Sequence, residues 1–256
     1  MPRLLILGGT GEARELGESL AGRADLTVTV SLAGRTARPA AQAVAVRVGG
    51  FGGAAGLAAY LRAQHIDALI DATHPFAVTI SAHAATATAA ASIPLLALRR
   101  PPWRPVAGDR WLNVADRDAA VAATGSTPRR IFLALGRQDL GPFERAPQHA
   151  YLVRSVDPVD PPLQLANATY VCARGPFSEA DDRALLGAHR IEAVVAKNSG
   201  GAATYSKIAA ARSLGLAVIM IARPAAPAVP TVETVAEAIA WLDHDHTLAA
   251  AKDRGV

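Results

Sequence analysis

The chain carries near its start a glycine-rich turn of a kind that can bind a phosphate group. The segment reads Leu7-Gly8-Gly9-Thr10-Gly11-Glu12-Ala13-Arg14 and stands between an apolar run and a helical pattern. Glycines at such a turn let backbone N–H groups approach a phosphate, which the N-terminus of the following helix also attracts. The match to the dinucleotide-binding pattern G-x-G-x-x-G is imperfect, because Arg14 stands where the third glycine or alanine belongs. The turn therefore predicts a nucleotide site, with a merely structural turn as the alternative.

The end of the second apolar strand indicates which nucleotide this would be. Ser31 stands twenty residues past Gly11, where an NAD site usually has an aspartate or glutamate for the ribose hydroxyl. Arg35 and Arg38 follow in the same loop. A missing carboxylate with arginines nearby suits a 2′-phosphate, so the pattern favours NADP over NAD. The alternative is a solvated basic loop.

A histidine-proline loop follows a further apolar strand. Its sequence is Asp71-Ala72-Thr73-His74-Pro75-Phe76-Ala77. In an open parallel sheet, the carboxyl end of such a strand lines the ligand crevice, and Pro75 holds His74 extended and outside the following helix. We expect Thr73 and Pro75 to contact the cofactor, and His74 to contact cofactor or substrate; Asp71 and His74 are the candidates for an acid–base role, and a hydrogen-bonding fixture is the alternative for His74. Asp71 could instead cap the following helix.

A second glycine-rich turn combines ammonium, hydroxyl and amide groups. It reads Lys197-Asn198-Ser199-Gly200-Gly201, and Thr204 and Lys207 follow. Such a cluster suits carboxylates or phosphates. Of the 26 basic residues only three are lysines, and two of these lie here, which indicates that compact ammonium groups are specifically wanted. We assign this segment to the substrate, together with Gly136, Arg137 and Gln138 at another strand end; the alternative is a surface loop with incidental lysines.

These sites require an alternation of strands and helices. Short β-branched or leucine-rich runs alternate with alanine-rich helical patterns, as in βαβ units with a parallel sheet. In the first half the expected strands are 4–7, 26–31, 44–48, 68–71 and 94–98. In the second half they are 111–114, 131–135, 151–154, 170–173, 193–196 and 217–221. We therefore predict an α/β protein of two doubly wound halves, residues 1–98 and 99–256.

Composition excludes several classes of protein. With 256 residues, of which 51% are hydrophobic and 19% charged, the chain can bury a sizeable core and is not intrinsically disordered. Its one cysteine, Cys172, excludes a disulfide framework and a zinc cluster of several thiolates, and we expect it to be buried in a strand. The longest stretch without charged residues, 72–98, holds two histidines and two prolines and is no membrane span. The apolar run before Gly8 is too short for a signal peptide, so a soluble, cytoplasmic protein is expected.

The charge distribution points to an anionic partner. The formal net charge is +4, and residues 99–222 alone carry 16 basic and 11 acidic groups. This excess suits an anionic ligand, although a diffuse surface excess is the alternative. No run of lysines and arginines is interleaved with aromatic residues, so nucleic acid is not the expected partner.

Five blocks of the sequence together resemble one known family, the precorrin-6A reductases of cobalamin biosynthesis. They appear in family order across residues 8 to 224, and the second and fourth are highly specific. The blocks are Gly8-Gly9-Thr10-Gly11-Glu12-Ala13-Arg14, Asp71-Ala72-Thr73-His74-Pro75-Phe76-Ala77, Gly175-Pro176-Phe177-Ser178, Lys197-Asn198-Ser199-Gly200-Gly201 with Thr204 and Lys207, and Arg223-Pro224.

The resemblance implies two Rossmann-like domains, residues 1–98 binding NADP and residues 99–256 binding substrate, with the active site in the cleft between them. It also implies hydride transfer from NADPH to a ring double bond of precorrin-6A, a tetrapyrrole polycarboxylate, to give precorrin-6B without a metal. A related reductase acts on the cobalt-containing intermediate, and that activity and a non-catalytic NADP-sensing protein are the alternatives. A short-chain dehydrogenase is disfavoured, because no tyrosine here has a lysine four residues on. The sequence does not define the oligomeric state, and a monomer is the working expectation.

Overall fold

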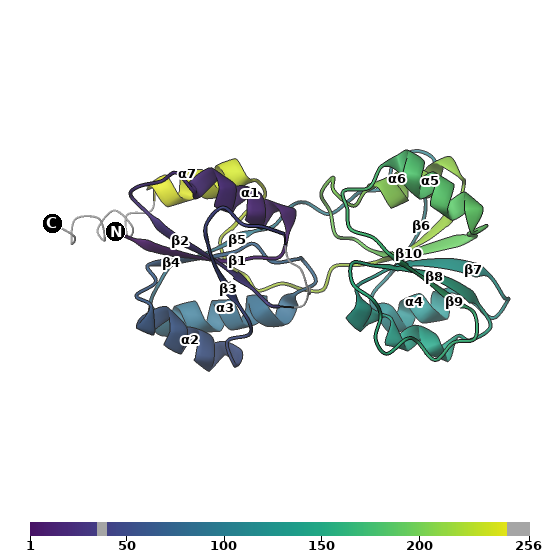
Figure 1. Cartoon of the computed structure of the whole chain (residues 1–256), viewed down its shortest axis with the longest axis horizontal. Helices are drawn as coiled ribbons and strands as arrows, with labels where there is room; N and C mark the ends of the chain where they lie inside the picture. The colour runs from purple at the N-terminus through teal and green to yellow at the C-terminus, as the bar shows by residue number, and fades with distance from the viewer. Residues whose placement is uncertain (35–39, 245–256) are drawn as a thin grey trace. The chain divides into compact units, whose positions relative to one another are not determined.

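The computed structural model describes residues 1–34 and 40–244 and divides the chain into two compact units (Figure 1). Unit 1 comprises Met1–Pro101 and the segment from Ala225 onward, and unit 2 comprises Pro102–Pro224. Within the described residues each unit contains a six-stranded parallel sheet with flanking helices. The predicted α/β class with two Rossmann-like parallel-sheet domains is confirmed.

Unit 1 is built on a sheet whose strand order reverses beside its first strand. Across the sheet the strands are β12 (Thr231–Val232), β5 (Leu95–Leu98), β4 (Ala68–Asp71), β1 (Arg3–Leu7), β2 (Thr27–Leu32) and β3 (Ala45–Val48). One face is covered by α1 (Gly11–Leu20) and α7 (Val235–His244), the other by α2 (Gly53–Ala63) and α3 (Val78–Ala91) (Figure 1). Because the order reverses between β1 and β4, the turns after these two strands border the crevice where ligands of such sheets bind.

The apolar runs in the sequence explain why β1 and β4 lie at the centre of this sheet. Residues 4–7 and 68–70 are almost fully buried, because helices cover both faces of the central strands. In α1 the buried residues Ala13, Leu16, Gly17 and Leu20 recur at helical spacing along one face. The sequence pattern and the packing therefore agree in this part of the chain.

Unit 2 repeats the arrangement. Its strands, in order across the sheet, are β6 (Arg110–Val114), β11 (Ala217–Ile221), β10 (Ala193–Lys197), β7 (Arg130–Ala134), β8 (Ala150–Ser155) and β9 (Ala168–Cys172). The helices α5 (Glu179–Ala188) and α6 (Ser206–Ser213) cover one face, and α4 (Arg117–Ala123) lies on the other (Figure 1). Two short 3-10 helices, Arg137–Asp139 and Gly141–Arg145, follow β7. Here the order reverses between β7 and β10, so the turns after these strands border the second crevice.

The predicted second domain, residues 99–256, is too long. After Pro224 the chain returns to unit 1, where β12 pairs with β5 at Thr231 and Val232. The apolar stripe of α7, Val235, Ala238 and Leu242, packs into the same core as α1. The chain returns to unit 1 because this buries the apolar stripe of α7 and adds a strand beside β5.

Cys172 is exposed and not buried as expected. It is the last residue of β9, which forms the edge of the sheet, and an edge strand has a neighbour on one side only. Among residues 1–34 and 40–244, no helix has the length and apolar character that crossing a membrane requires.

A histidine is fully buried just before β8. The side chain of His149 is 0% exposed. Its Nδ1 accepts a hydrogen bond from the backbone N–H of Arg129 at 3.2 Å, and its Nε2 lies 3.1 Å from the carbonyl oxygen of Gly125. The neutral ring with its proton on Nε2 satisfies both contacts, whereas a protonated ring would set two N–H donors against each other. Burial accordingly lowers the pKa of His149 below its ordinary value of 6.5.

This histidine makes the stability of unit 2 depend on pH. The imidazole of the unfolded chain takes up a proton near pH 6.5, and that of the folded chain does so only at lower pH. The free energy of unfolding therefore decreases as the pH is lowered from about 6.5 to the pKa of the folded chain. We expect the melting temperature to drop from pH 7 to pH 5.5 and the drop to be smaller in His149→Gln, whose amide can make both contacts without titrating. The control is His65→Asn, at an exposed position where φ is 49°, which suits asparagine. Equal pH slopes in His149→Gln and the wild type would contradict this account.

Candidate functional site

The glycine-rich turn joins β1 to α1 and is tied to the turn after β4. The backbone N–H of Gly8 donates to the carbonyl oxygen of Ser31 at 2.9 Å, which holds the turn against the end of β2. Thr10 caps α1, because its Oγ1 accepts from the N–H of Ala13 at 3.1 Å. The same hydroxyl donates to the carbonyl oxygen of Ala72 at 2.7 Å. One threonine thus fixes both turns that border the crevice of unit 1.

The glycines in this turn have different tasks. A Cβ at Gly8 would lie 2.9 Å from Cγ1 of Val30, so Gly8 allows the turn to pack on the sheet. Gly9 has a φ of 111°, which only glycine adopts readily. A Cβ at Gly11 would meet no described atom within 4 Å. Gly11 therefore borders open space, at the point where α1 begins.

The start of α1 can accept an anion. Within the described part of the chain, the backbone N–H groups of Gly11 and Glu12 have no acceptor, since they belong to the first turn of the helix. Unsatisfied N–H groups and the positive end of the helix dipole attract phosphate. Together with the open space at Gly11, they fit the pyrophosphate of a dinucleotide.

Asp71 holds the histidine-proline loop in place. Its carboxylate is 3% exposed; one oxygen accepts from the backbone N–H and hydroxyl of Thr73, at 3.1 and 2.6 Å, and the other from the hydroxyl of Ser81 at 2.6 Å. Both oxygens thus bond to the protein's own donors, which favours a positioning role for Asp71 over direct proton transfer. His74 is half-buried, and its Nδ1 accepts from the N–H of Phe76 at 3.2 Å. In the neutral ring the proton is then on Nε2.

Arg99 and Arg100, which directly follow the predicted domain boundary at residue 98, lie beside both turns. Arg100 forms an ion pair with Glu12 at 2.5 Å, and Arg99 lies 3.8 Å from the Asp71 carboxylate. They lie close together with Leu98 and with residues of both turns: Thr10, Glu12, Thr73 and Pro75. The signal was present in the sequence, because both arginines directly follow β5 and therefore lie at the same edge of the sheet as the turns after β1 and β4.

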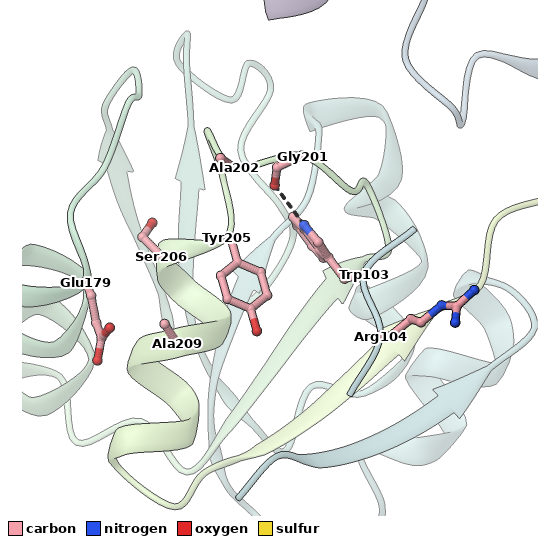
Figure 2. A pocket seen from close by; sticks show the side chains of 8 residues that line it. All are labelled: Trp103, Arg104, Glu179, Gly201, Ala202, Tyr205, Ser206 and Ala209. Atoms are coloured by element: carbon pink, nitrogen blue, oxygen red, sulfur yellow. Dashed lines mark hydrogen bonds between the residues drawn. The ribbon is translucent and has the colours of Figure 1, made fainter. Parts of the chain in front are cut away.

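The second glycine-rich turn follows β10 and is held mainly by Trp103. The amide of Asn198 accepts from the backbone N–H of Trp103 at 2.8 Å and donates to its carbonyl oxygen at 3.0 Å. The indole N–H of Trp103 donates to the carbonyl oxygen of Gly201 at 2.8 Å (Figure 2). Arg223 donates to the carbonyl oxygens of Asn198 and Ser199, both at 2.9 Å. Asn198, predicted as a substrate ligand, thus uses its amide to fix the turn.

The two lysines of this segment differ in accessibility. Lys207 is 5% exposed; its ammonium donates to the carbonyl oxygen of Thr204 and lies 5.0 Å from the centre of the Trp103 ring. The sequence had predicted an ammonium open to a ligand, but the structure uses it inside unit 2. Lys197 is 17% exposed and pairs with Asp139 at 2.7 Å, and Asp139 also pairs with Arg117 at 2.8 Å. Of the two, Lys197 is the one that an outside anion can reach.

The remaining predicted site residues are spread over both units. Gly136, Arg137 and Gln138 follow β7 at the reversal point of unit 2 and are exposed, and Arg137 donates to the carbonyl oxygen of Pro158. In unit 1, Ser31 is buried at the end of β2. Arg35 lies outside the described residues, as does Arg38.

An open hollow of about 540 Å³ lies beside the second glycine turn (Figure 2). Trp103 and Tyr205 meet edge to face on its wall, with ring centres 5.6 Å apart, and Arg104 stands on its rim. The other lining residues are Glu179, Gly201, Ala202, Ser206 and Ala209. Aromatic faces with a guanidinium nearby suit a planar ligand that carries carboxylates. Within residues 1–34 and 40–244, no group of three or more histidine, cysteine, aspartate or glutamate side chains could hold a metal ion.

Comparison with known proteins gives matches along nearly the whole chain. The family model "Precorrin-6x reductase CbiJ/CobK" matches residues 3–243. A precorrin-6A reductase of Sinorhizobium sp is 54% identical over 95% of this chain and 93% of its own length. A more distant relative, the cobalt-precorrin-6A reductase of Priestia megaterium, is 28% identical over 86% of this chain and 90% of its own.

A solved structure supports the same assignment. The "CobK precorrin-6A reductase" structure is 50% identical, covers 95% of this chain and 96% of its own, and superposes with a TM-score of 0.91. The first glycine-rich turn, the histidine-proline loop and the lysine-containing turn all lie within residues 3–243, which the family model matches. The chain therefore belongs to the precorrin-6x reductase family.

Proposed function

We propose that this chain reduces precorrin-6A to precorrin-6B with NADPH. The observation that carries the proposal is the open anion site at Gly11, in a member of a reductase family. Reduction of the ring double bond consumes one hydride and one proton, so that precorrin-6A, NADPH and a proton give precorrin-6B and NADP⁺. Metal-free precorrin-6A is favoured over the cobalt-containing form, because the relatives named precorrin-6A reductase are 43–54% identical and those named for the cobalt form 28–29%.

Unit 1 would hold the cofactor. The N–H groups of Gly11 and Glu12 would donate to the pyrophosphate, and Arg100 would offset the Glu12 carboxylate beside it. When bound, the nicotinamide supplies the hydride. Thr73, His74 and Pro75 would border it, because the Asp71 and Thr10 contacts fix their loop against the glycine turn. A water molecule would supply the proton, or Nε2 of His74 after the ring has taken up a second proton, because a neutral imidazole that lost its only N–H proton would be left as an imidazolate.

NADP is favoured over NAD because β2 ends without a carboxylate. Ser31 stands at that position, and its hydroxyl accepts a hydrogen bond of 3.3 Å from the guanidinium of Arg47. A positive group at this place suits a 2′-phosphate and not a bare ribose hydroxyl.

Unit 2 would bind the carboxylates of the substrate. Lys197, the Gly200–Gly201 turn and Gly136–Gln138 lie at the carboxyl ends of β10 and β7, the reversal point of its sheet. The φ values of Gly200 and Gly201, 67° and 74°, give the turn a left-handed backbone that only glycine adopts readily. The hollow beside Trp103 and Tyr205 would accept a face of the macrocycle.

The direct test is incubation of the purified chain with precorrin-6A and with NADPH in which deuterium replaces the hydrogen that is transferred as hydride. We expect loss of the NADPH absorbance together with a product that contains one deuterium and one solvent hydrogen more than the substrate. An NADP-sensing protein would bind NADPH without oxidising it. Turnover of only the cobalt-containing substrate would show the alternative activity.

The glycine turn gives a prediction with its own control. Gly11→Val should weaken NADPH binding by about tenfold or more, at least about 1.4 kcal/mol, and leave the melting temperature unchanged, because its side chain enters open space that the pyrophosphate needs. Gly8→Val should instead lower stability by about 1–3 kcal/mol, because its side chain meets Val30. Titration calorimetry and thermal melts separate the two effects. Unchanged NADPH affinity in a folded Gly11→Val variant would show that the turn has only a structural role.

The two lysines should also separate. Lys197→Ala should raise the KM for precorrin-6A about 5- to 30-fold, or about 1–2 kcal/mol, and leave NADPH affinity unchanged. The fold should tolerate the change, because Arg117 still pairs with Asp139. Lys207→Met should lower the melting temperature, because it removes the contact to Thr204 inside unit 2. A Lys197→Ala variant that loses NADPH affinity but keeps its KM would reassign the second glycine turn to the cofactor.

A further inference from the structure

An arginine of β3 stands beside the end of β2, in a strand to which the sequence pattern assigned no role in the site. Arg47 and Ser31 are direct partners in the parallel pairing of β2 and β3. Their side chains meet, since Nη1 of Arg47 lies 3.3 Å from Oγ of Ser31. The end of β2 is in turn bonded to the phosphate-binding turn through Gly8. Arg47 therefore lies at the position where dinucleotide sites recognise the ribose of the adenosine half.

The guanidinium of Arg47 is held in one orientation. Its carbon lies 3.8 Å from the centre of the Phe51 ring and 5.1 Å from that of Tyr60. Nη1 also donates to the carbonyl oxygen of Gly49, and Nη2 donates to that of Gly50. The aromatic contacts and the two carbonyls fix the group before any ligand arrives, which lowers the entropic cost of binding.

These contacts leave one edge of the guanidinium for a ligand. Of its five N–H groups, three donate to Ser31, Gly49 and Gly50. Among the described residues, the Nε–H and the second Nη2–H have no acceptor. In a planar guanidinium, Nε and Nη2 share one edge, and donors on that edge can match two oxygens of one phosphate.

The hydroxyl of Ser31 faces this arginine. The hydroxyl is 5% exposed, so it has little surface for a direct contact, but it accepts from Nη1. A carboxylate at this position would neutralise Arg47 and would repel a phosphate. A serine keeps the charge available.

We infer that Arg47 binds the 2′-phosphate of the dinucleotide through its Nε and Nη2 edge and thereby sets the preference for a phosphorylated cofactor. The inference rests on the proposed NADPH-dependent function. It names a residue that the sequence pattern did not indicate, since that pattern pointed to Arg35.

The test is equilibrium titration of the whole chain with NADPH and with NADH, which lacks the 2′-phosphate and shares every other group. Arg47→Gln should weaken NADPH binding about 10- to 100-fold and change NADH binding less than about threefold, as expected for loss of a bidentate charged contact. In the wild type, added salt should reduce the ratio of the two affinities, because the attraction is electrostatic. No substrate is needed, so the result does not depend on turnover.

Matched variants separate this role from others. Arg62→Gln removes an exposed arginine of α2 that also donates to a backbone carbonyl, and it should leave both affinities unchanged. A purely structural role for Arg47 would lower NADH and NADPH affinity equally, and that result would overturn the inference. Retention of the NADPH preference in Arg47→Gln with its loss in Arg35→Gln would also overturn it, while the proposed function would stand. Equal affinities in the wild type would refute the NADPH dependence itself.

Discussion

Parallel strand order constrains where this chain can place polar groups. Helices cover both faces of each sheet, so the central strands must be apolar, and the functional groups gather in the turns at the carboxyl ends. Where the strand order reverses, neighbouring turns diverge to opposite faces and leave their N–H groups for a ligand. Unit 1 has this point between β1 and β4, and unit 2 between β10 and β7. The first glycine-rich turn, the histidine-proline loop and the lysine-containing turn all lie where that constraint places them.

Most of the polar side chains in these turns hold the turns themselves. The carboxylate of Asp71 accepts hydrogen bonds from Thr73 and Ser81. The amide of Asn198 makes two hydrogen bonds with the backbone of Trp103, one as acceptor and one as donor. A turn without regular structure has many backbone groups to satisfy, and a buried side chain satisfies them at fixed geometry. The ligand is then left mainly with the backbone N–H groups and a few charged ends.

The sequence predicted the sheets well, and which side chains of the turns face inward less well. The central strands were readable because their apolar runs are continuous, and the glycine turns because their residue types are restricted. The two-residue β12 and the seven-residue α4 are too short for a periodic signal, and the return of α7 to unit 1 is a tertiary effect. Lys207 and Asp71 carry the residue types of a ligand site, but only tertiary packing shows that they face inward. Arg47 became visible only through the pairing of β2 with β3.

Charge compensation at both crevices limits what each cation contributes to binding. Arg100 faces Glu12, Arg99 faces Asp71, and Lys197 faces Asp139. An incoming anion must share these cations with a carboxylate that is already paired, so its gain is the difference between two ion pairs and not a whole one. The benefit of the arrangement is orientation, because the paired cations are held in place without a ligand.

Arg47 is held differently, by aromatic rings and uncharged oxygens. Its charge has no carboxylate partner among the contacts that the structure describes. Its full charge is therefore available to a phosphate, and a single arginine in that setting can discriminate between two cofactors that differ by one phosphate group.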